Sequence, residues 1–169
     1  KWLTDDYSEG REFFVQFNFK VDRNSSFHFR MRNKVTERNS KDDVNGIDGQ
    51  VQLNKTNFRL NYDQRINSRI SLQSRIEFTR FLYGEDKSNG LLLFQDFIYT
   101  FKKLPLKLYN RIAVFDAESY DARLYAYESD LLYVFSIPSY YNRGLRTYLM
   151  AKYEIGKNID LWARCSIWS

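Results

Sequence analysis

Residues 27–35 read FHFRMRNKV and residues 69–79 read RISLQSRIEFT, and both stretches alternate apolar with polar or charged side chains. Successive side chains of a β-strand point to opposite faces, so each stretch predicts a strand with one apolar and one polar, basic face. The same alternation predicts strands over residues 12–21, 26–36, 50–63, 69–82, 91–101, 106–115, 145–153 and 159–168. The chain is therefore expected to be all-β, with about eight antiparallel strands.

The connections between these strands sort by length. Those after the first, third, fifth and seventh strands are short, whereas residues 37–49, 84–90 and 116–144 form longer segments. Outer-membrane barrels have short turns on one side and longer loops on the other. We therefore expect an up-and-down transmembrane β-barrel of the outer-membrane type, with residues 1–169 as a single barrel region and 116–144 as a long external segment. The chain begins at Lys1 and stops inside a strand pattern, so we expect an incomplete portion of a larger barrel.

The rhythm of the third strand slips by one position. Val51 and Leu53 are odd-numbered, whereas Phe58, Leu60 and Tyr62 are even-numbered. One inserted residue shifts the two faces in this way, which predicts a β-bulge near residues 54–57.

Alternation alone also fits a half-buried soluble sheet, so a soluble β-domain that binds ligand on its apolar face stays open. Three features favour the membrane. The strands reach about 10 residues, as a tilted membrane strand requires, the loops sort by side, and aromatic residues gather near the strand ends. The predicted aromatic girdle comprises Tyr62, Phe81, Tyr83, Tyr99, Phe101 and Tyr153.

Composition and charge narrow the class. Mean hydropathy is −0.59, and no apolar run approaches the ~20 residues of a membrane helix, which excludes a helical membrane protein. The 26 Lys and Arg exceed the 21 Asp and Glu by five, and the excess is spread along the strands. It predicts a basic lumen lined by Arg30, Arg32, Arg59, Arg75, Arg111, Arg146 and Arg164. Such a set either pairs with inward acids such as Glu77 or makes a porin-like channel for small, anionic solutes.

The segment 116–144 is rich in tyrosine and acids, and its apolar centre predicts an extra hairpin or a folded cap rather than an open loop. The candidate partner or cap surface comprises Tyr120, Arg123, Tyr125, Tyr127, Tyr140 and Tyr141. The acids of the segment lack the register of a calcium loop. We expect them to pair with Arg123, Arg143 and Arg146 instead.

Few residues suggest catalysis or metal binding. His28 is the only histidine and lies among Arg30 and Arg32, so we expect a solvated lumen histidine, although Ser26 shares its face. The single cysteine, Cys165, is expected to be a small strand residue, and it allows no intrachain disulfide. We expect no catalytic residues, no metal and no cofactor, hence a protein that is not an enzyme.

Five motifs in the second half of the chain resemble one family. They are LLFQD at 92–96, LPLKL at 104–108, FDAESYDARLYAYE at 115–128, FSIPSYY at 135–141 and DLWAR at 160–164, with a looser fit over 58–81. The stretch 91–168 resembles outer-membrane β-barrel proteins of Bacteroidota that carry helix-hairpin-helix (ComEA-like) repeats ahead of the barrel.

The resemblance implies the outer membrane of a Gram-negative bacterium, with the helix-hairpin-helix portion and further strands outside this sequence. Any DNA contact would belong to that portion, so no direct nucleic-acid contact is expected here. The implied partners are outer-membrane lipid, lipopolysaccharide and other envelope proteins. The expected function is that of a non-enzymatic, membrane-embedded component of an envelope assembly.

Overall fold

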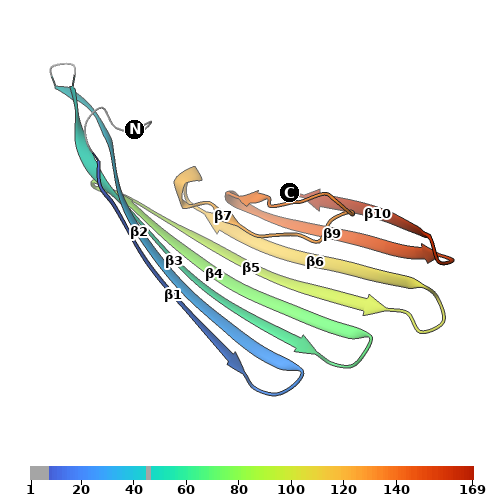
Figure 1. The fold of residues 1–169 in the computed structure, drawn as a ribbon. Coiled ribbons are helices and arrows are strands. Elements are labelled where there is room, and N and C mark those ends of the chain that lie inside the picture. The colour runs from blue at the N-terminus through green and yellow to red at the C-terminus, as the bar shows by residue number, and fades with distance from the viewer. Residues whose placement is uncertain (1–7, 45–46) are drawn as a thin grey trace.

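The computed structural model describes residues 8–44 and 47–169, which form one curved antiparallel sheet (Figure 1). Its eight strands pair in the order β1-β2-β3-β4-β5-β6-β9-β10, so each long strand lies beside the next long strand of the chain. The all-β antiparallel meander predicted from the alternation is confirmed. Within the described residues β1 and β10 do not pair with each other, so the sheet is not closed.

The strands are long. Their bounds are β1 Gly10–Lys20, β2 Ser25–Val44, β3 Ile47–Arg65, β4 Ile70–Tyr83, β5 Asp86–Thr100, β6 Leu106–Ala117, β9 Asn142–Ile155 and β10 Ile159–Trp168. Between β6 and β9 the chain forms the short 3₁₀ helix η1 (Tyr120–Ala122) and a small hairpin of β7 (Leu124–Tyr125) and β8 (Ser139–Tyr140). We call residues 118–141 the cap, because this segment lies over one face of the sheet (Figure 1).

Short turns join the strands at one end of the sheet, as the sequence predicts. The carboxylate of Asp22 accepts the backbone N–H of Asn24 at 2.6 Å, and the side-chain oxygen of Asn67 accepts the N–H groups of Arg69 and Ile70 at 2.9 and 3.0 Å. Asp and Asn favour turns because their side chains satisfy nearby backbone groups in this way. Gly156 supplies the positive φ of 69° in the turn between β9 and β10.

At the other end, two of the three predicted long loops are wrong. β2 continues to Val44 and β3 begins at Ile47, so most of residues 37–49 belong to a two-stranded ribbon. β5 begins at Asp86, directly after a tight turn in which Gly84 has a φ of 56°. Polar residues indicated loops, but they continue the backbone ladder beyond the apolar part of each strand. Among the residues that the structure describes, only the cap is a long connection.

The predicted β-bulge at residues 54–57 is also wrong. β3 pairs without interruption from Gln50 to Gln64 with β2, and from Leu53 to Arg65 with β4. The register irregularity lies instead between Asn39 and Asp43 of β2. The rhythm slips because Val51 and Leu53 lie on the polar face, where Leu53 is paired with Tyr83, rather than because a residue is inserted.

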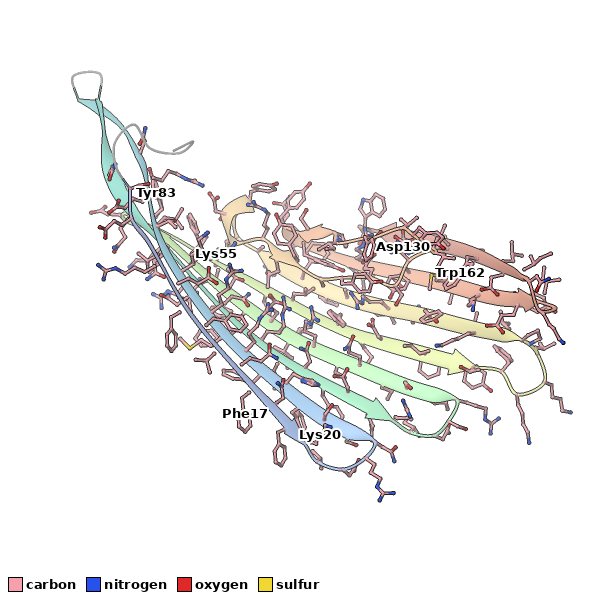
Figure 2. All side chains as sticks on the ribbon, in the orientation of Figure 1. Phe17, Lys20, Lys55, Tyr83, Asp130 and Trp162 are labelled. Carbon is pink, nitrogen blue, oxygen red and sulfur yellow. The ribbon has the colours of Figure 1, made fainter. Side chains whose placement is uncertain are left out.

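The two faces of the sheet differ sharply. Phe17 points away from one face, whereas Lys55 and Asp130 lie on the other (Figure 2). The buried apolar cluster lies between the polar face and the cap. It consists of Leu92, Phe94, Ala113 and Ala117 of the sheet with Leu124, Ala126 and Tyr140 of the cap. Gly90 allows this close approach, because a Cβ there would clash with the backbone oxygen of Ala122 and lie 2.8 Å from Cδ1 of Leu124. In the described ranges there is no helix with the length and hydropathy to cross a bilayer.

Candidate functional site

The polar face carries the arginines that the alternation placed together. Cross-strand pairing puts on this single face Arg30, Arg32, Arg59, Arg75, Arg111, Arg146 and Arg164. Most of their charge is matched by acids of the same face or of the cap. The result is an electrostatic layer between the sheet and the cap.

Glu128 is the centre of this layer. It comes from the cap and is 0% exposed. Arg146 donates to its two oxygens at 2.7 and 3.0 Å, Tyr140 donates at 2.9 Å, and Arg164 donates a further hydrogen bond. Strands β9 and β10 therefore hold the middle of the cap through one carboxylate.

Burial and pairing act in opposite directions on the ionisation of Glu128. Burial alone would raise its pKa, but the hydrogen bonds from Arg146 and Tyr140 and the charges of Arg146 and Arg164 outweigh it, so the pKa lies below the ordinary 4.5. Burial and the adjoining carboxylate raise the pKa of the Tyr140 hydroxyl, which therefore remains a donor. The carboxylate is held charged and the phenol neutral.

Further contacts fix the rest of the cap. Arg111 makes a bidentate pair with Asp96 at 2.5 and 2.6 Å and donates to the backbone oxygen of Tyr127 at 2.7 Å. The hydroxyl of Tyr148 accepts the N–H of Ser129 at 3.2 Å. Lys55 lies on the same face but on the more distant strand β3, and it donates to the backbone oxygens of Asp121 and Arg123 at 2.7 and 3.3 Å. The cap is thus bound to β3, β6, β9 and β10.

The acids of the cap region behave largely as predicted. Asp116 pairs with Arg143 at 2.6 Å and Glu128 with Arg146 at 2.7 Å, which confirms two of the expected pairings. Arg123 stacks instead on the ring of Tyr120, with 3.9 Å from its guanidinium carbon to the ring centroid. Among the described residues no group of three or more His, Cys, Asp or Glu side chains could hold a metal ion.

The six predicted cap-surface residues do not form one surface. Tyr140 is buried, with its ring 5.2 Å from that of Phe115 in an edge-on contact. Tyr120, Tyr125, Tyr127 and Tyr141 are exposed. The most exposed large hydrophobic residues of the cap are two that the candidate set omitted, Tyr133 at 92% and Phe135 at 82%. Their neighbours Leu132, Val134 and Ile137 are exposed too. An apolar run among polar residues was the feature of the sequence that could have identified these exposed residues.

The apolar face carries one continuous row across seven strands. The row consists of the paired residues Phe17, Phe29, Leu60, Ile76, Leu93, Val114 and Leu145. Each is between 39% and 61% exposed. No part of the described chain packs over this row to shield it from the surroundings.

The predicted girdle is divided between the two faces. Tyr62, Tyr99 and Tyr153 lie in the apolar face near the short turns, and Phe101 follows with its ring 4.8 Å from that of Tyr99. Phe81 and Tyr83 lie on the polar face instead. Both are odd-numbered residues of β4, as is Glu77, so they point to the same face as Glu77, and Phe81 is buried.

His28 has three polar neighbours on the polar face. Its Nδ1 is 2.8 Å from Oδ1 of Asn18, and its Nε2 is 3.2 Å from Oγ of Ser26 and 3.1 Å from Oδ2 of Asp63. A carboxylate beside Nε2 favours a proton on that nitrogen, and a protonated Nε2 cannot accept the hydroxyl proton of Ser26. The arrangement favours a structural histidine over a general base.

Comparison of the chain with protein-family models, with curated proteins and with solved structures finds no match in any of the three.

Proposed function

We propose that the chain is part of an outer-membrane β-barrel and acts as a non-enzymatic, membrane-embedded component of a larger envelope assembly. The observation that carries the proposal is the exposed apolar row from Phe17 to Leu145 on the face opposite the buried ion pairs. Soluble monomers rarely leave so extended an apolar surface open to water. A closed barrel in lipid covers such a face with acyl chains and encloses the charges.

The height of the apolar belt supports a bilayer. On β4 the belt runs from Ile70 to Phe78, about 27 Å of strand. A tilt of about 40° reduces this to about 20 Å, close to the ~25 Å band of outer-membrane barrels. Above it the same face becomes polar at Arg80, Asn89 and Asp116. The height of the belt and its change to polar residues at Arg80 therefore support a lipid-facing band.

Site-specific fluorescence tests this proposal. The only cysteine, Cys165, is replaced by serine, and a single cysteine is introduced at Ile76 or, as the matched control, at Gln73 of the same strand. After reconstitution, brominated lipid should strongly quench a fluorophore at position 76 and leave one at 73 largely unquenched. Equal, weak quenching at both positions, or extraction of the protein without detergent, would contradict the proposal and favour a soluble β-domain.

The cap supports a passive role rather than an open pore. Glu128, Asp130 and the backbone oxygen of Tyr127 occupy the polar face above β6, β9 and β10. Planar-bilayer recordings should therefore show no steady conductance. An open, anion-selective current would favour the alternative, a porin-like channel for small anionic solutes.

The outer surface of the cap supports assembly with another envelope protein. Tyr133 and Phe135 are almost fully exposed, and aromatic residues are the anchors that protein interfaces favour. Detergent pull-downs of the full-length protein from native membranes should retain a stoichiometric envelope partner. Replacing both aromatic residues by serine should release the partner, whereas Ile66→Ser, at an exposed turn, should retain it. Loss in both variants, or no partner, would contradict the assembly role.

A further inference from the structure

A strongly basic pocket lies between β2, β3, β4 and the start of the cap. It has a volume of about 330 Å³. We call it the basic pocket, because its charged lining consists of six cations and one acid: Arg30, Arg32, Lys34, Lys55, Arg59, Arg123 and Glu77. The cap wall adds Leu124 and Tyr125.

The acids near this pocket already form ion pairs with two of its arginines. Glu77 takes a bidentate pair from Arg59 at 2.6 and 2.9 Å, and Arg32 makes a similar pair with Glu12 of β1 at 2.9 and 3.0 Å. For the other four cations, Arg30, Lys34, Lys55 and Arg123, no carboxylate of the described residues lies within 4.0 Å. The Nε of Arg30 is buried without a hydrogen-bond acceptor. The pocket therefore holds an uncompensated positive charge.

The register of the strands is a second, independent indication of an anion-binding site. Arg30 of β2 is directly paired with Arg59 of β3, and Lys34 is directly paired with Lys55. Like charges in directly opposed cross-strand positions destabilise a sheet. Two such pairs only four residues apart concentrate a repulsion that a bound anion would relieve.

We propose that the basic pocket binds a phosphate group. Guanidinium groups bind phosphate oxygens in pairs and lysines add point charges. The volume is at the small end of the range for ligand sites, which fits inorganic phosphate or a small phosphorylated solute. The pocket opens on the polar face, away from the apolar row, so a water-soluble phosphate reaches it without crossing lipid.

Binding is tested by calorimetry on the detergent-purified protein with inorganic phosphate and, in a second arm, with detergent-solubilised phosphatidylglycerol. The test variant is Arg30→Gln with Lys34→Gln. The control is Lys20→Gln with Lys107→Gln, which removes the same charge elsewhere on the polar face. We expect saturable binding, weakened about tenfold or more by the test variant and less than about twofold by the control.

The test variant should remain folded, because its substitutions remove like-charge repulsion, and its melting temperature in the absence of phosphate checks this. Phosphate should raise the melting temperature of the unmodified protein and not of the test variant. Saturation by free phosphate assigns the site to a solute, whereas saturation by phosphatidylglycerol alone assigns it to a lipid head group. No saturable binding of either probe, or equal weakening by the control, would overturn the proposal. Neither result depends on the lipid-quenching or pull-down experiments.

Discussion

Removing the carboxylate of Glu128 should release the cap. In Glu128→Ala the guanidinium groups of Arg146 and Arg164 and the hydroxyl of Tyr140 lose their shared acceptor. Hydrogen bonds to charged groups contribute about 1.5–3 kcal/mol each, and the four that Glu128 accepts would sum to about 6–12 kcal/mol if they were independent. The donors share one carboxylate and water enters the space that it leaves, so the sum is too large. Removing one partner of a buried ion pair lowers the free energy of unfolding by about 3–5 kcal/mol, and we expect a loss of this size in Glu128→Ala.

The free energy of unfolding is measured by urea titration in detergent micelles, with the fluorescence of Trp162 and Trp168 of β10 as the signal. Hydrogen exchange at the N–H of Glu128, which donates to the oxygen of Ser136 at 2.9 Å, reports the cap itself.

The control is Asp116→Ala, which breaks an ion pair whose side chains are 83% and 45% exposed and should lose at most about 1 kcal/mol. Equal losses in the two variants, or unchanged exchange at the Glu128 N–H, would refute the account of the cap.

Three further perturbations test other parts of the structure. Because folding lowers the pKa of Glu128, the contribution of its carboxylate to the free energy of unfolding is complete above the unfolded pKa of 4.5 and is lost as the pH falls through the lower, folded pKa. The free energy of unfolding measured against pH should decrease in this acid range, and Glu128→Gln should not show that decrease. Gly90→Ala should destabilise by about 1–3 kcal/mol in the same urea titration, because its Cβ would clash with the backbone oxygen of Ala122 and press on Leu124, whereas Gly10→Ala, with 3.5 Å to the nearest atom, should be neutral. Ile76→Lys should lower the free energy of unfolding in reconstituted bilayers by about 2–4 kcal/mol if lipid covers the apolar row, whereas an unchanged free energy of unfolding would indicate that water covers it.

The sequence predicts the strands and faces well because a period of two records which side of a sheet each residue occupies. Arg59, Ile76 and Arg111 were all placed on the correct side by this pattern. It fails where the polarity of a face changes along a strand. Phe81 and Tyr83 were predicted for the exterior, but they lie on the polar face, where Phe81 is buried and the hydroxyl of Tyr83 donates to the backbone oxygen of Asn39.

The contacts of the cap could not be derived from local pattern. Glu128 meets Arg164, 36 residues later in the chain, and Lys55 meets Asp121, 66 residues later. The like-charged pairs of the basic pocket were equally hidden, because only the strand register sets Lys34 opposite Lys55.

The anchors of the cap also make its attachment depend on strands that follow it in the sequence. The cap lies between β6 and β9 in the chain, and the guanidinium groups that hold Glu128 belong to Arg146 of β9 and Arg164 of β10. Until this hairpin pairs with β6, the carboxylate of Glu128 lacks both of these cations. Pairing of β9 and β10 with the sheet and closure of the cap should therefore be cooperative, so that neither is complete without the other.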